Sequence, residues 1–287
     1  MPEPAWFLFR ERSFGMSCRK KPCHFLLIML SVVGLVALFF VLNLTKWLPE
    51  AQFRVLTRIL FFCLTAFLAY LALHNSTILE KGAVTERVWF WLGLGISFWS
   101  ARQFLAMIGS IPNPYEPTPP YLRLIWISAY PCLVVGLTNE LRSLPSLPMP
   151  VSSWLVVGGA LASVSAIVSI LSIEANLSGG VESPYWCTEL LPLLTPFLSL
   201  VSMSISSLIL IKVVRGLAAP SWILITGAFL LATLTQSWFA ASRSYVTYAA
   251  TPYPRIDLLS ASALAMAIIG SAHVAHLASG IQDVVVG

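Results

Sequence analysis

Residues 25–44 read FLLIMLSVVGLVALFFVLNL, an apolar run without a charged side chain. About 20 apolar residues are enough for an α-helix to cross the hydrocarbon of a bilayer. The run is longer than the ~7–15-residue apolar region of a secretory signal peptide, and it lacks a small-x-small cleavage pattern. It therefore predicts a retained first transmembrane helix.

The rest of the chain has the same character. Its 287 residues are 57% hydrophobic and 10% charged, with a mean hydropathy of +0.83, whereas soluble domains are about 45–50% apolar and about 25% charged. We therefore expect an all-α polytopic membrane protein, with the lipid bilayer as its first partner. The net charge of +5 is scattered along the chain, and without a basic stripe we expect no nucleic-acid partner.

Apolar stretches of sufficient length predict eight transmembrane helices. They cover residues 25–44, 57–76, 88–110, 122–139, 151–173, 190–211, 218–242 and 256–279. The third is interrupted by Arg102 and the fourth contains Pro131, so seven spans remain possible if the fourth is re-entrant.

Basic residues set the predicted orientation. Positive residues gather on the cytoplasmic side of a first helix, and five precede this one: Arg10, Arg12, Arg19, Lys20 and Lys21. The 174–189 loop has acidic residues and no Lys or Arg, which suits an external loop. With eight spans, both the basic segment 1–24 and the short tail 281–287 are expected in the cytoplasm.

The chain also looks duplicated, with one four-helix unit at 25–140 and a second at 151–280. A single shift of the sequence along itself places identical residues on each other: Pro120 on Pro254, Leu124 on Leu258, Ser128-Ala129 on Ser262-Ala263 and Gly136 on Gly270. Trp99 and Trp238 lie at a similar offset. An even number of helices per unit predicts a parallel repeat, related by an axis along the membrane normal.

Arg102 is the most costly residue in the predicted membrane region. A central Arg costs at least ~2.5–3.5 kcal/mol on insertion scales, so it usually faces a partner or a cavity; otherwise it snorkels to the interface. Gln103 adjoins it, and Arg243 stands near the end of the seventh span, where snorkelling is favoured.

Arg123 and Asp257 begin equivalent spans. They are either a pair across the repeat axis or two solvated charges at the membrane interface.

Two loops rich in Pro and Tyr, at 112–121 and 245–254, join predicted spans on the outer side. Pro restricts them to extended or turn conformations, and Tyr suits the headgroup region. They are either an aromatic belt with rigid connectors or the mouth of a ligand site.

All four histidines fall at predicted cytoplasmic helix ends: His24, His74, His273 and His276. His273 and His276 share a helix face, and converging imidazoles can bind a metal or haem. No carboxylate accompanies them, so we expect interfacial packing, with His74, His273 and His276 as the alternative metal or haem site.

No P-loop, zinc-protease or nucleophile-elbow sequence motif is present. The sequence predicts neither an enzyme nor a cofactor.

Residues 119–137 read PPYLRLIWISAYPCLVVGL. This segment resembles the eight-helix N-terminal membrane domains of bacterial sensor proteins that continue into PAS, diguanylate cyclase or histidine kinase modules. Tyr130-Pro131 and Gly136-Leu137 match the family spacing, and Trp126 fills its aromatic place. Arg123 stands where the family has an acidic residue, and Asp257 resembles the acidic residue before the last helix.

The resemblance implies a sensor in the bacterial plasma membrane. Only Gly280 to Gly287 follow the last predicted span, too short for an output domain, so the chain is expected to be a module separated from its effector or one that acts through partners.

Our first hypothesis is therefore a sensor or regulatory module that responds to a ligand or lipid and acts through a cytoplasmic or membrane protein partner. Its predicted ligand site lies between the third, fourth, seventh and eighth spans and uses five residues: Arg102, Gln103, Tyr130, Arg243 and Asp257.

Two alternatives stay open. One is an accessory subunit of a larger membrane complex, holding haem or pigment near the histidines. The other is a small-solute transporter, for which Pro131, Pro192 and Pro196 are pointers to broken helices. A scarcity of carboxylates inside the membrane argues against proton coupling.

Overall fold

The computed structural model describes residues 22–79, 82–110, 121–144, 186–213, 216–241 and 256–286. These ranges form seven helices and contain no strand: α1 (Pro22–Thr45), α2 (Glu50–Ile78), α3 (Val84–Ser110), α4 (Tyr121–Ser143), α6 (Trp186–Val213), α7 (Ala219–Ala241) and α9 (Ile256–Val286). The predicted fifth span, residues 112–120, the 245–254 loop and Arg243 lie outside the described residues, as does the side chain of Arg123.

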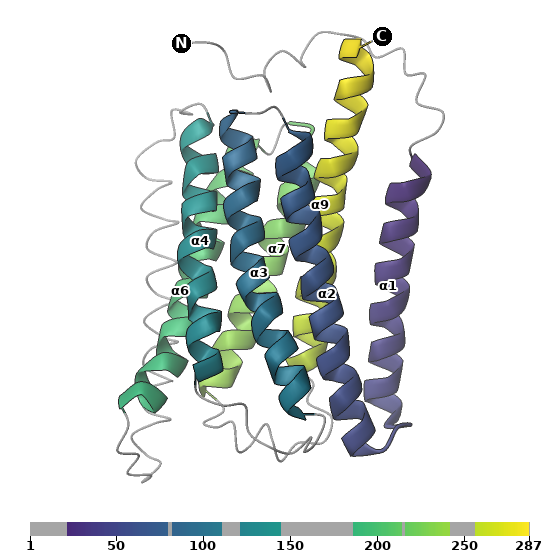
Figure 1. The fold of residues 1–287 in the computed structure, drawn as a ribbon, viewed down its shortest axis with the longest axis vertical. Helices are drawn as coiled ribbons and strands as arrows, with labels where there is room; N and C mark the ends of the chain where they lie inside the picture. Colours follow the sequence, from purple (N-terminus) through teal and green to yellow (C-terminus); the bar gives the residue numbers. More distant parts are fainter. Residues whose placement is uncertain are drawn as a thin grey trace.

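Six of the described helices are long and apolar enough to cross a membrane: α1, α2, α4, α6, α7 and α9. The expected all-α, multi-pass membrane architecture is thereby confirmed at this level. The helix α3 falls short of the hydropathy of the others because it contains Arg102, Gln103 and several Trp residues. It nevertheless runs alongside α2 and α4 in the bundle and packs closely against both (Figure 1).

Each described helix runs between two ends of the bundle (Figure 1). The Glu50 end is where α2, α4, α6 and α9 begin and α1, α3 and α7 end; the opposite, His74 end is where α1 begins and α9 ends. Lys212, in the last turn of α6, donates from Nζ to the carbonyl oxygens of Leu141 (3.1 Å) and Leu144 (3.5 Å). The neighbours α4 and α6 therefore run in the same direction.

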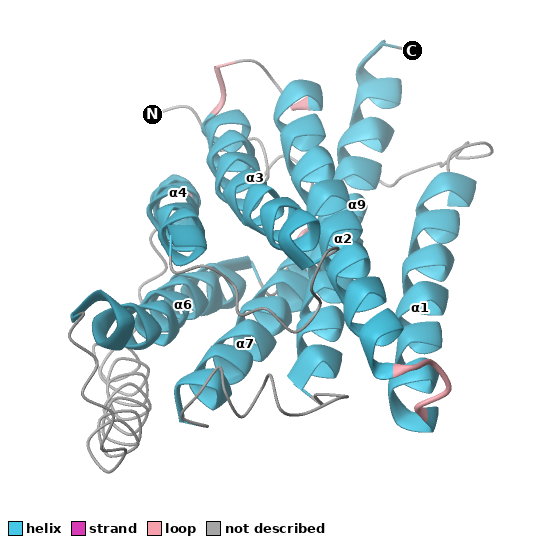
Figure 2. Cartoon of the chain, turned by 60° about the horizontal axis from the view of Figure 1, so that its bottom comes forward, coloured by secondary structure: helices cyan, strands magenta, loops and turns pink. Residues whose placement is uncertain are grey.

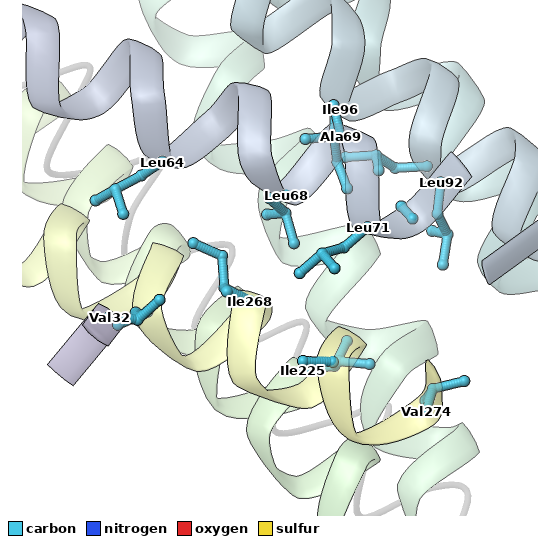
Figure 3. Packing of buried hydrophobic residues seen from close by; sticks show 14 of the residues in the cluster. Val32, Leu64, Leu68, Ala69, Leu71, Leu92, Ile96, Ile225, Ile268 and Val274 are labelled. Atoms are coloured by element: carbon cyan, nitrogen blue, oxygen red, sulfur yellow. The ribbon is translucent and has the colours of Figure 1, made fainter. Parts of the chain in front are cut away.

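The apolar core lies where α2 crosses α9, with contributions from α1, α3, α4, α6 and α7. Figure 3 shows Leu64 and Leu68 of α2 near Ile268 of α9. In a bilayer this burial gains packing rather than release of water, because lipid tails are as apolar as the core. The helix α1 is the most peripheral and keeps an apolar face outward, with Leu26, Leu27 and Leu30 exposed, as expected for contact with lipid.

Glycines set the closest helix approaches. A methyl group on Gly136 of α4 would lie 3.1 Å from the carbonyl oxygen of Val88 in α3. The corresponding distance from Gly270 of α9 to the carbonyl oxygen of Ser221 in α7 is 3.0 Å. Small residues let helix backbones come this near in membranes. Gly136 shares this role between α3 and α4 with Gly95, where a methyl group would lie 2.9 Å from the carbonyl oxygen of Ala129, and Gly270 has it between α7 and α9.

Two expectations about individual helices are corrected. The second helix begins at Glu50 rather than at residue 57, and its first turn is closed by an ion pair of 2.8 Å between Glu50 and Arg54. The fourth is one continuous helix through Pro131, so the re-entrant alternative is wrong. Figure 2 shows α6 lying between α4 and α7, and it packs against both.

Candidate functional site

Five side chains of α3 and α4 gather in the half of the bundle toward the Glu50 end, and we call them the polar-aromatic cluster: Trp99, Arg102 and Gln103 of α3, and Trp126 and Tyr130 of α4. Their spacings of three and four residues place them on one face of each helix. The Arg102 guanidinium lies 5.1 Å from the centre of the Trp126 ring. The indole of Trp99 meets the Tyr130 ring edge-on, with centroids 5.7 Å apart.

Arg102 combines two contacts. Its Nη1 donates to Oε1 of Gln103 at 3.0 Å, and its position over Trp126 is a cation–π contact of about 0.5–2 kcal/mol, larger when desolvated. Arg102 stands two turns before the end of α3 at Ser110, which is roughly 12 Å along the helix axis at about 1.5 Å per residue. The Arg102 side chain is therefore held against α4 within the bundle. Snorkelling to the interface would not require this contact with Trp126.

A chain of hydroxyl groups connects this cluster to the second half of the molecule. The buried hydroxyl of Tyr130 hydrogen-bonds to Ser199 of α6. The Ser199 hydroxyl lies 3.1 Å from that of Thr233 in α7, and Thr233 donates onward to the carbonyl oxygen of Phe229. Interhelical hydroxyl bonds of this kind are worth about 0.6 kcal/mol each in membranes, so their main effect is to fix how α4, α6 and α7 lie relative to one another.

The structure thus brings together three of the five predicted site residues: Arg102, Gln103 and Tyr130. Asp257 lies at the same end, in the first turn of α9, with 3% of its surface exposed. The interpretation of Asp257 as a solvated charge at the membrane interface is wrong, because its side chain is buried. Arg243 lies outside the described residues.

The histidines occupy the other end of the bundle and form two separate groups. His273 Nδ1 lies 2.7 Å from the Ser221 hydroxyl, and His276 stacks on Phe25 of α1 with centroids 5.6 Å apart. His74 stacks on Tyr70 of its own helix. Within the described ranges no three His, Cys, Asp or Glu side chains come close enough to hold a metal ion. His74 is therefore not gathered with His273 and His276.

Glu140 and Asn75 are among the buried polar residues that the sequence analysis missed. Glu140 is 6% exposed, and its Oε2 has no hydrogen-bond partner among the described residues. It stands just beyond the predicted fourth span but inside the helix that the structure shows, so a carboxyl does lie in that span. Asn75 of α2 is fully buried and donates from Nδ2 to the carbonyl oxygen of Ser271 at 3.0 Å.

The burial of Glu140 could have been predicted from the sequence. It lies one helical turn after Gly136 and so shares the face of α4 that packs on α3. Ser199 and Thr233 had no comparable signal, because Ser and Thr are common on every face of these helices and only the packing of α6 on α4 and α7 selects the pair.

Comparisons of the chain with family models, with curated proteins and with solved structures gave no match. Function is therefore argued from the arrangement of the side chains.

Proposed function

We propose that the chain is a non-enzymatic integral membrane sensor or regulatory module. It binds a ligand or lipid at the polar-aromatic cluster and acts through a cytoplasmic partner at the His74 end. The observation that carries the proposal is the placement of the Arg102 guanidinium over Trp126, in the same cluster as Tyr130, whose hydroxyl is bonded into α6. An ionisable residue kept inside a membrane protein at this cost is by default a functional residue.

The helix α7 supplies a route between the two ends. Toward the Glu50 end its Thr233 belongs to the hydroxyl chain that starts at Tyr130. Toward the His74 end its Ser221 is bonded to His273 of α9. A ligand that displaces α4 would move α7 through the first contact and α9 through the second, which is the physical connection that coupling between two sites requires.

The eight-helix, two-unit architecture is part of the same proposal. The parallel neighbours α4 and α6 support a further crossing between Leu144 and Trp186, because the chain has to return to the Glu50 end there, and residues 151–173 are apolar enough to provide it. The helices α2, α3 and α4 begin almost equally far in sequence before α6, α7 and α9, respectively. This constant spacing supports a parallel repeat.

The contacts of the paired glycines support the repeat more directly. The sequence separation between Gly136 and Gly270 is almost the same as that between Val88 and Ser221, whose backbone atoms they approach. Two helix pairs thus meet at equivalent points. From the basic N-terminal segment and the resemblance to bacterial sensors, we propose that the His74 end and both termini are cytoplasmic and that the membrane is a bacterial plasma membrane.

The test is mild detergent purification of the chain from its native membrane, followed by mass spectrometry and a visible spectrum of the intact assembly. We expect a colourless assembly that contains a stoichiometric cytoplasmic protein. Arg102→Gln and Asp257→Asn should change the amount of that partner while the chain still elutes as a folded protein, and Arg54→Gln at the same end should not. A Soret or pigment band would overturn the proposal in favour of an accessory subunit.

A further inference from the structure

Two arginines at the His74 end of α3 and α4 have no ion-pair partner within the described residues. Arg87 lies in the first turn of α3 and Arg142 in the last turn of α4, and both side chains are exposed. The nearest carboxyl groups along the chain point elsewhere. Glu86 accepts from the backbone nitrogen of Gly82, and Glu140 is buried on the other side of α4. Both positive charges are therefore available to an anion outside the bundle.

The packing of α3 on α4 brings these two charges together. The contact of Gly136 with the backbone of Val88 holds the helix axes about 8–10 Å apart. Counted from this contact, Arg142 starts roughly 7 Å nearer the His74 end than Arg87, at about 1.5 Å per residue. Side chains lean toward the N-terminus of their own helix, and α3 and α4 run in opposite directions (Figure 1). Arg87 therefore leans toward the His74 end and Arg142 leans back, so the guanidinium groups approach one level.

A third polar side chain belongs to the same place. Asn139 is one helical turn before Arg142 and shares its face of α4, at about the depth of Arg87 in α3. Its side chain is partly exposed and makes no hydrogen bond with the part of the chain that the structure describes. The amide group adds two N–H donors to those of the two guanidinium groups. We call Arg87, Asn139 and Arg142 the interfacial donor group.

Apolar side chains lie next to this group on the membrane side. Phe90, one turn after Arg87 on the same face of α3, exposes 48% of its surface, and Val135, two turns before Arg142 on the same face of α4, exposes 39%. In a bilayer these faces contact lipid tails, while the donors stand at the helix ends, where headgroups lie. The molecule that fits both parts has anionic oxygens at one end and apolar chains at the other.

We propose that Arg87, Asn139 and Arg142 bind the phosphate of one anionic phospholipid in the leaflet at the His74 end. The two guanidinium groups and the amide donate to its oxygens, and its acyl chains lie along Phe90 and Val135. The inference goes beyond the sensor proposal, because this site is at the opposite end of α3 and α4 from the polar-aromatic cluster. A free phosphate ion has the same headgroup chemistry but makes no contact with the apolar side chains.

The test is native mass spectrometry of the full chain in detergent, titrated with dioleoylphosphatidylglycerol, dioleoylphosphatidylcholine or inorganic phosphate. We expect one phosphatidylglycerol to bind before any phosphatidylcholine. Arg87→Gln and Arg142→Gln should each raise the concentration at half-occupancy of that first lipid about fivefold, the effect of one basic residue at an anionic headgroup. The double variant should raise it about 25-fold, and Asn139→Leu, which removes a neutral donor, about twofold.

Two variants that remove a positive charge already engaged within the protein serve as controls. Arg54→Gln removes the partner of Glu50 at the other end of the bundle. Lys212→Met removes, at the same end, an ammonium group that donates to the carbonyl oxygens of Leu141 and Leu144. Both should bind phosphatidylglycerol like the unmodified chain. Size-exclusion chromatography of each variant confirms that it is folded before it is titrated.

Four results would overturn the proposal. Equal binding of the two lipids, or equal losses in the control variants, would show that the charges of the interfacial donor group select no lipid. If Arg87→Gln and Arg142→Gln each remove a different bound lipid, the two arginines do not share a site. Inorganic phosphate that binds through both arginines, without any preference for phosphatidylglycerol, would make the site one for a free anion.

The outcome is separate from that of the sensor proposal. If phosphatidylglycerol binds as expected but no cytoplasmic protein co-purifies with the chain, the lipid site stands and the sensor function falls. If Arg87→Gln and Arg142→Gln leave lipid binding unchanged but lose a co-purifying protein, the lipid site is wrong and the two arginines contact an acidic surface of that partner.

Discussion

The helix pairs α3–α4 and α7–α9 meet through a glycine that rests on the backbone of the preceding helix, yet they carry different side chains around that contact. Near the Glu50 end, α3–α4 holds the Arg102 cation against the Trp126 ring. In the register that the glycine contacts define, Arg102 corresponds to Thr235 and Tyr130 corresponds to Leu264. Thr235 is buried and donates to the carbonyl oxygen of Leu231 within its own helix.

The same register separates the pairs near the His74 end. Glu140 of α4 corresponds to Val274 of α9, and both are buried. One pair thus has ordinary apolar packing where the other has a carboxyl. The comparison teaches that the packing scaffold can be repeated while the chemistry is confined to one copy, and that residues which depart from the apolar copy are the candidates for function.

The largest expected effect tests whether the two glycine contacts are equivalent. Gly136→Val and Gly270→Val should each lower the free energy of unfolding by about 3 kcal/mol, because the added carbons meet a neighbouring backbone that cannot shift cheaply. Unfolding in mixed detergent micelles measures the loss. Gly34→Val and Gly109→Val are the controls, because a methyl group there would meet nothing within 4 Å. If only one of the two valine variants loses stability, the two glycine contacts are not equivalent.

The next effect has the opposite sign. Replacing Glu140 by Val, the residue of the second pair, should raise the free energy of unfolding by about 2 kcal/mol, because it removes a buried polar group with an unsatisfied oxygen. Glu140→Gln should give a smaller gain. A loss of stability in both variants, measured by the same unfolding experiment, would show that the carboxyl has a partner that stabilises it.

A smaller effect probes the hydroxyl chain that joins the first pair to α6. Tyr130→Phe and Ser199→Ala should each destabilise, and a double-mutant cycle should give a coupling energy of about 0.6 kcal/mol, the average for such bonds in membranes. Ser204→Ala, whose hydroxyl bonds only to its own helix, is the control and should add independently to Tyr130→Phe. If the effects of Tyr130→Phe and Ser199→Ala on the free energy of unfolding are fully additive, the hydroxyl link between α4 and α6 is wrong.

The smallest effect is expected at Thr235 of α7, which corresponds to Arg102 in the register of the glycine contacts. Thr235→Val keeps the side-chain shape and removes one local hydroxyl bond, so the free energy of unfolding should change by less than about 0.5 kcal/mol. The amount of cytoplasmic partner that co-purifies with the chain should not change at all. A change in the partner comparable to that caused by Arg102→Gln would mean that both copies take part in the site.

The apolar runs predicted the helices of this protein well because hydropathy and length are local properties of the chain. The first helix was expected at 25–44 and lies at Pro22–Thr45. The start of α2 was missed because Glu50 and Arg54 lower the local hydropathy, although the helix includes them. Arg102 was singled out because its cost in lipid can be read from one position alone.

Hydropathy and length along the chain were therefore enough to predict a multi-pass membrane protein, the position of most described helices and the cost of placing Arg102 in lipid. The folded bundle was needed to find that Arg102 rests on Trp126, that Tyr130 reaches the distant Ser199, and that Asp257 and Glu140 are buried. The physical reason is that hydropathy acts on each segment separately, whereas a contact between helices depends on the rotation and depth of both. Those quantities are set by small residues such as Gly136 and Gly270, where the backbones meet.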